Sequence, residues 1–326
     1  MPKLLGCILL LAFGTGGFAQ SLPSNELGHS FQLNTNVTVY WNAPTKDLPA
    51  HLWTYRVLPS EFSPAAISNL TVLGSFTEKD RDRTMALNPI FNHADRISYR
   101  SSDKVRELDI LPNLGWIYYT DSKAVGRRND NGVPKNEKKT LNLAIDYMKI
   151  IGVDRSNLAT KSHSSDLHAS YILGKLTDYH TNHTQTTFID TRGVMIARAI
   201  DGISFWGKGT RDGLTMEFGN DAKISRLDIL WRKLQRDTLY PTVKSEIILK
   251  WIRDGKTKWD YMTADLDWSS VKKMTINKVT PYYFGEYHDV EQYRVYPFAT
   301  LETTIETGQT NKTIYLFCPI IDEEKP

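Results

Sequence analysis

The sequence predicts an α+β fold of tandem units, each with one helix packed on an antiparallel β-meander. The clearest signal lies in Phe188–Arg232, where apolar and polar residues alternate over Leu214–Phe218 and thus define one buried face of a strand. The turn formers Gly219–Asp221 and a return strand over Ile224–Trp231 follow, with a phase change that predicts a bulge near Ser225. A helix followed by antiparallel strands occurs twice after residue 135, which predicts a repeat of about 100 residues.

The N-terminal residues have the features of a targeting signal rather than of a folded element. Lys3 supplies a positive charge, Leu4–Phe13 a short apolar run, and Gly17–Ala19 a small-residue cleavage pattern. We therefore expect residues 1–19 to be a signal peptide cleaved near Ala19. The mature chain would be secreted or periplasmic, with no transmembrane segment.

Residues 20–120 predict an N-terminal α+β domain. Ser63 is expected to cap a helix that begins at Pro64, reaches Leu73 and stops at Gly74. Strands are expected on both sides of it, over Phe31–Trp41, Leu52–Leu58, Ile97–Arg100, Val105–Ile110 and Trp116–Thr120.

Residues 121–135 carry almost no apolar side chains and predict a linker. Arg127 and Arg128 within it are compatible with an anion site, but a solvated connection is the favoured interpretation.

Two helix-plus-sheet units, 136–238 and 239–326, are expected beyond this linker. Asn136 can cap a helix that Gly152 ends, and a second helix over Thr242–Asp254 is followed by Gly255. The segment Leu167–Tyr179 leads into the central strands of the first unit. The strands of the second unit are expected over Lys273–Phe284, Gln292–Ile305 and Thr313–Ile321.

The pattern Arg198–Ile203, followed by the strand and turn of Leu214–Ile224, resembles that of PepSY-type domains. It is also similar to the extracytoplasmic YycH/YycI regulators, which carry such units in tandem. The resemblance covers residues 136–235 and is weaker over 240–321. It implies non-enzymatic roles, such as inhibition of proteases or regulation of a membrane partner from outside the membrane. A cleavable signal without a retained anchor departs from those regulators and puts control of a sensor kinase in doubt.

Charge and cysteine content narrow the functional classes. A formal net charge of +3 argues against a dedicated nucleic-acid binder. Cys7 leaves with the signal peptide, so Cys318 has no partner for an internal disulfide. Cys318 lies in an apolar strand, which favours a buried structural thiol over a nucleophile.

No catalytic, cofactor-binding or metal-binding residue is assigned from the sequence. Four histidines could form a metal cluster, but their spacing lacks a zinc signature and favours a polar loop: His163, His168, His180 and His183. Carboxylate pairs could serve a hydrolase if the fold brought them together, namely Asp265 with Asp267 and Glu286 with Asp289.

Trp206, Tyr282 and Tyr283 are the candidate partner-binding aromatics, although half-buried sheet residues are the favoured interpretation. Asn-x-Ser/Thr sequons, relevant only in a glycosylating host, occur at Asn36, Asn69, Asn182 and Asn311.

The leading hypothesis is an exported, non-catalytic binding or regulatory protein that takes a protein or peptide partner on its sheets, by strand addition. The alternative is a secreted hydrolase that uses carboxylates on polysaccharide or peptide. No cofactor is expected.

Overall fold

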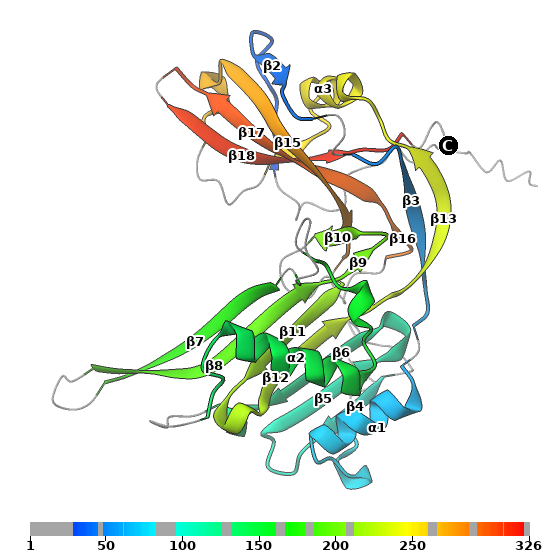
Figure 1. Ribbon diagram of the computed structural model, residues 1–326, viewed down its shortest axis with the longest axis vertical. Coiled ribbons are helices and arrows are strands. Elements are labelled where there is room, and N and C mark those ends of the chain that lie inside the picture. The colour runs from blue at the N-terminus through cyan, green and yellow to red at the C-terminus, as the bar shows by residue number, and fades with distance from the viewer. Residues whose placement is uncertain are drawn as a thin grey trace, which may run out of the picture.

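The protein is built mainly of β-sheet, as a computed structural model shows (Figure 1). The structure describes residues 29–44, 48–60, 62–82, 96–125, 132–160, 167, 169–179, 185–206, 212–259, 266–286, 292–308 and 310–322. Within these residues there are three α-helices, and the strands form two large sheets and a three-stranded one. The predicted fold class, tandem units of one helix on its own meander, is therefore wrong.

The sheet in the lower part of Figure 1, called the lower sheet here, is antiparallel, in the order β4-β5-β6-β12-β11-β8-β7. Two helices, α1 (Pro64–Leu73) and α2 (Glu137–Ile151), lie on one face of it and enclose a core that includes Leu70, Met148 and Phe218. The strands are β4 (Ile97–Arg100), β5 (Arg106–Leu111), β6 (Trp116–Asp121), β7 (Ala169–Tyr179), β8 (Gln185–Ala197), β11 (Gly213–Phe218) and β12 (Ile224–Leu230).

The second large sheet, called the upper sheet, has the order β1-β14-β18-β17-β15-β10-β9, and β2 also pairs with β15. The helix α3 (Ser245–Arg253) contributes Ile248 and Ile252 to its core. Its strands are β1 (His29–Ser30), β2 (Thr38–Trp41), β9 (Ala199–Ile200), β10 (Ile203–Trp206), β14 (Lys258–Trp259), β15 (Lys273–Phe284), β17 (Pro297–Glu306) and β18 (Asn311–Pro319). None of the described helices is long and apolar enough to cross a membrane.

A narrow sheet joins the two large ones, in the order β13-β3-β16 (Figure 1). The chain descends through β3 (His51–Leu58) and returns through the antiparallel β13 (Lys233–Pro241), with β16 (Arg294–Val295) on the other side of β3. The lower sheet is thus formed from residues between these two strands, while β9 and β10 leave that stretch to join the upper sheet.

This topology explains why the predicted tandem units do not form. The α2 helix packs on β5 and β6, which precede the predicted linker 121–135, as well as on strands that follow it. In addition, β12 pairs directly with β6, so strands on both sides of residues 121–135 belong to one sheet. The sheets therefore do not follow the predicted boundaries of 136–238 and 239–326.

Local signals are confirmed where they depend on a few neighbouring residues. The Ser63 and Asn136 side chains accept hydrogen bonds from the backbone at Ala66 and Lys139, and so cap α1 and α2 as predicted. Gly152 ends α2 at φ 83°. In the pairing of β11 with β12, Glu217 lies opposite Arg226 and Phe218 opposite Ile224, so Ser225 is the additional residue of a bulge. This confirms the predicted bulge.

A buried ionic group, the junction cluster of Arg198, Asp212, Arg232 and Glu286, lies where the lower sheet meets the strands above it. Arg232 Nη1 contacts Asp212 Oδ2 at 2.6 Å, and Arg232 Nη2 donates to the Glu286 carbonyl at 2.6 Å. Arg198 Nη1 donates to the Arg232 carbonyl at 2.6 Å, and its guanidinium lies 4.8 Å from the Trp231 ring centre. The cluster thus connects the ends of β8, β11, β12 and β15.

Replacing Asp212 with Asn should be strongly destabilising, because it leaves the buried Arg232 guanidinium without its counter-charge. Asn keeps the shape and tolerates the positive φ of this residue, 49°. We expect the free energy of unfolding to fall by about 3 kcal/mol in urea titrations. The matched control is Asp254→Asn in the exposed Lys250–Asp254 pair of α3, which should cost about 0.5 kcal/mol or less. Similar losses for both variants would contradict a structural role for the cluster.

Candidate functional site: the β7–β8 hairpin

The β7–β8 hairpin is the part of the lower sheet that extends furthest from the body of the molecule (Figure 1). The two strands pair from Ala169 and Ile196 out to Tyr179 and Gln185. Only residues 192–197 of β8 also pair with β11. Among the described strands, the outer part of the hairpin is therefore a two-stranded ribbon, an arrangement that is marginally stable without further packing.

The outer strand of this hairpin, β7, is an edge of the lower sheet. Within the described residues it is hydrogen-bonded only to β8. Its outward N–H and C=O groups are therefore a template for another strand. It contains no proline over its 11 residues, so no residue of β7 lacks a backbone donor.

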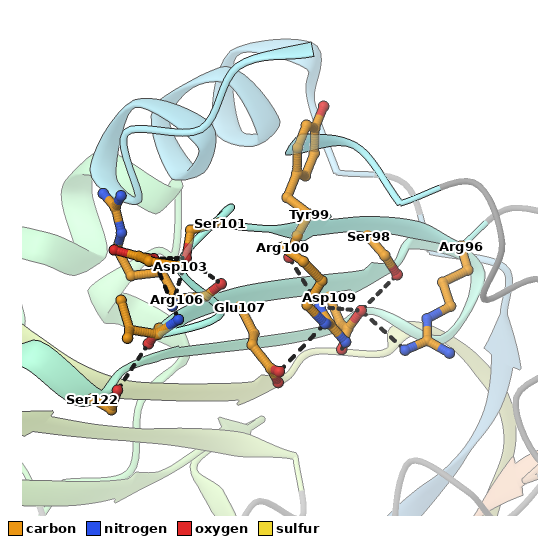
Figure 2. A network of polar contacts seen from close by, with 11 residues as sticks. Arg96, Ser98, Tyr99, Arg100, Ser101, Asp103, Arg106, Glu107, Asp109 and Ser122 are labelled. Carbon is orange, nitrogen blue, oxygen red and sulfur yellow. Dashed lines mark hydrogen bonds and ion pairs between the residues drawn. The ribbon is translucent and has the colours of Figure 1, made fainter. Parts of the chain in front are cut away.

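The opposite edge of the same sheet, β4, is covered in a way that β7 is not. Arg81 bridges to Tyr99, and the Asp82 amide donates to the Ser98 carbonyl at 2.9 Å. Figure 2 shows that Asp109 gathers side chains on one face of β4 while Tyr99 points to the other face. Asp109 is 3.0 Å from Arg96 Nη2 and 2.9 Å from Arg100 Nη2, and Ser98 Oγ donates to it at 2.6 Å.

This buried network holds β4 against β5, while Arg81 and Asp82 pair with its outward backbone groups. Burial alone would lower the pKa of Arg100, but hydrogen bonds to Asp109 and its charge outweigh burial and raise that pKa. The guanidinium therefore stays charged and paired with Asp109.

The upper sheet has one interrupted edge along β15. Pairing with β2 ends at Ile276 and pairing with β10 begins at Tyr283. Between them the strand carries a bulge at Asn277 and a proline, Pro281. Bulges and prolines both oppose strand addition. The edge of β7 is therefore a better candidate for pairing with a partner than the edge of β15.

One face of the hairpin carries exposed apolar side chains next to two positive charges. Tyr171 is 39 % exposed, Leu173 44 % and Ile189 38 %. Leu173 pairs with Arg192 and Lys175 with Ile189, so these side chains lie on the same face. Neither Lys175 nor Arg192 forms an ion pair among the described residues. We call these five residues the arm patch.

The arm patch continues the helix-covered face of the sheet outward, and Tyr171 at its inner end lies near the first turn of α2. Nearer the centre, Val194 and Ile196 pack with Ala144 and Met148 of that helix. Partial burial, and then the charge of Glu137 in the first turn of α2, raise the pKa of Tyr171. The hydroxyl therefore stays protonated and can donate a hydrogen bond at neutral pH.

The other face of the hairpin has a different character. The register shifts between Gly174 and Lys175, where Asp190 of β8 is the additional residue of a bulge. A Cβ at Gly174 would lie 2.2 Å from Thr191 Oγ1 and 2.4 Å from Asp190 Oδ1, so glycine makes room for both side chains. Thr191 in turn donates to Glu217 at 3.4 Å, so the carboxylates of Asp190 and Glu217 both lie on this face.

The two predicted partner-binding aromatics whose side chains are described, Tyr282 and Tyr283, are partly or fully buried. Tyr283 is 1 % exposed, and its hydroxyl donates to the Trp53 carbonyl at 2.9 Å, so it is a core residue. Tyr282 is partly buried, with its ring centre 6.0 Å from that of Phe298. Trp206 is the last residue of β10 and pairs with Phe284, and its side chain is outside the description.

Three of the sequons are described. Asn36 and Asn311 are exposed, as is Asn69, whose amide donates to the Ile150 carbonyl at 2.8 Å. A glycan on Asn69 would therefore replace a contact between α1 and α2. Asn182 lies outside the described residues.

The residues weighed for metal binding and catalysis fall into two groups. Those outside the described residues are His163, His168, His180, His183, Arg127, Arg128, Asp265 and Asp289. Among the described ones, Asp267 accepts from the Ser269 amide and caps a short turn, and Glu286 is buried in the junction cluster. In the same residues no group of three or more His, Cys, Asp or Glu could hold a metal ion. Cys318 is buried in β18, and burial raises the pKa of its thiol, as expected of a structural residue.

Comparisons with known proteins leave the family open. No family model matches the chain, and no curated protein matches it. Among solved structures, the chain is similar to an uncharacterized protein from Eubacterium rectale ATCC 33656, at 10 % identity and a TM-score of 0.44. The match covers 89 % of this chain and 90 % of that one. A likeness at this score carries no argument about function.

Sequence reasoning missed all five residues of the arm patch. The two-residue spacing of Tyr171, Leu173 and Lys175 could have indicated a strand with apolar and charged side chains on one face. Nothing local indicates that this strand lies at a sheet edge, because that depends on which distant strands pair with β8.

Replacing Gly174 with Ala should loosen the hairpin, because the new methyl group would collide with Thr191 and Asp190. We expect a loss of about 1–3 kcal/mol, concentrated in the outer ribbon. Hydrogen exchange should become faster across β7 and β8 and stay unchanged in α2. Ser170→Ala, on the same face of β7, is the control and should leave exchange unchanged. Equal effects of the two changes would contradict the packing described for Gly174.

Proposed function

We propose that this chain is an exported, non-catalytic binding or regulatory protein that takes a protein or peptide partner by strand addition at β7. Main-chain hydrogen bonds would supply the affinity, and side-chain contacts on the two faces of β7 would supply the selectivity.

The observation that carries this proposal is the edge of β7, without proline and paired only with β8 among the described residues. The described parts of two other sheet edges are less suited to strand addition than β7. Arg81 bridges to β4, and Pro281 interrupts β15. The exposed Tyr171, Leu173 and Ile189 support the same site, because contiguous apolar residues on a surface ribbon mark interaction sites.

Export is proposed from the signal-like residues 1–19, and a role outside the membrane agrees with the resemblance to PepSY-type and YycH/YycI proteins. Both are inferences from the sequence. They fit a partner that is presented outside the cytoplasm, as an extended segment of another protein.

The proposal is tested with the full chain and a displayed library of short random peptides. Peptides that bind should slow hydrogen exchange of the β7 backbone, residues 169–175, and leave β18 unaffected. Leu173→Lys should weaken binding roughly tenfold, because it removes an apolar contact at the centre of the edge. Tyr315→Lys, at a similarly exposed position of β18 (42 %), should leave binding unchanged.

Two outcomes would overturn the proposal. One is the recovery of peptides that protect a different part of the chain. The other is an affinity that depends equally on Leu173 and Tyr315.

A further inference from the structure

The charges of the hairpin differ between its two faces. The arm patch presents Lys175 and Arg192, neither of which is ion-paired among the described residues. The opposite face presents Asp190 and, one strand further in, Glu217. A strand added at β7 would lie between these two environments, and its alternate side chains would meet opposite potentials.

The order of side chains along the arm patch specifies which residue type fits at each position. Tyr171 and Leu173 are exposed and apolar, and Lys175 follows at the same two-residue spacing. Residues directly opposite one another on paired strands lie within contact distance. An added strand would therefore place two apolar side chains beside Tyr171 and Leu173, and a third side chain beside the Lys175 ammonium.

Arg192 strengthens the positive potential at that third position. It lies on β8, next to Leu173 and one strand away from the added segment, roughly 10 Å between backbones. That separation is well within the Debye length of about 30 Å at 0.01 M salt, so at low salt its charge acts on a group bound beside Lys175.

We infer that the β7 edge selects an extended acidic-apolar segment, in which two apolar residues and one Asp or Glu alternate on the side facing the arm patch. This inference rests on the proposed function and specifies which partner segments the β7 edge prefers. Acidic residues that face the other side would meet Asp190 and are disfavoured. Gly174 leaves the space on that side to Asp190 and Thr191, so small residues such as Ser or Thr fit there.

The test uses two synthetic peptides with blocked ends. In the first, valine, valine and glutamate occupy the three alternate positions that face the arm patch, and threonine fills the positions between them. The second peptide, its twin, has lysine in place of glutamate. The full chain should bind the glutamate peptide roughly tenfold more tightly than its twin at low salt, measured by fluorescence anisotropy. The ratio should shrink toward one in molar salt, where the Debye length is about 3 Å.

Lys175→Glu should reverse the preference, so that the lysine peptide binds more tightly. The matched control is Lys312→Glu, a reversal at an exposed position of β18, which should leave the ratio as it is in the unaltered chain. Unchanged hydrogen exchange in α2 checks that both variants remain folded.

The outcomes separate this inference from the function on which it rests. Protection of β7 by both peptides with equal affinity would overturn the charge selectivity and leave strand addition standing. Failure of every peptide to protect β7 would overturn both. A peptide-free dimer that already protects β7 would also overturn the inference, because a second copy would then be the occupant of the edge.

Discussion

The arrangement of the molecule depends on the buried contact between Arg232 and Asp212. The chain leaves the lower sheet at Arg232, and the guanidinium there connects Asp212 at the start of β11 with the Glu286 carbonyl just after β15. Arg198, at the root of β8, is held by the Arg232 carbonyl and by the Trp231 ring. A buried ion pair contributes little net stability compared with apolar packing, but it tolerates few alternative arrangements. We interpret the cluster as a device that fixes where the two large sheets meet.

The same cluster fixes the base of the hairpin. The inner part of β8 is held on both sides, by β7 and β11, and lies under α2, whereas for residues 185–191 β7 is the one described strand that pairs with it. The hairpin therefore has a rigid root and a lightly supported outer ribbon. Such a ribbon gains the packing that it lacks when a third strand pairs with it, which is the physical reason for assigning binding to this edge.

Features of the fold could be predicted from the sequence where they depend on neighbouring residues, and could not where they depend on residues far apart in the chain. The caps at Ser63 and Asn136, the end of α2 at Gly152 and the bulge at Ser225 each depend on a few neighbouring residues, and the sequence predicted them correctly. The strand β13 was missed, because Lys233–Pro241 is largely polar and pairs with β3, which lies more than half the chain length before it. The sheet order was not predicted either, since the pairing of β12 with β6 joins segments that look like separate domains in the sequence. For the same reason the sequence did not show that β7 is a sheet edge, and it left Tyr283 as a candidate surface residue when it is a core residue.

Disulfide trapping at β7 tests the central claim most directly. A cross-strand disulfide requires Cα atoms about 4.4–6.8 Å apart, so it reports direct pairing. Cys318 is buried and does not compete, and Cys7 is replaced by Ser in both variants. A bound peptide that carries one cysteine beside its apolar positions should become linked to the Leu173→Cys variant. The Tyr315→Cys variant in β18 should remain unlinked. Equal linkage of both variants, or linkage of neither, would contradict the assignment of the partner site to β7.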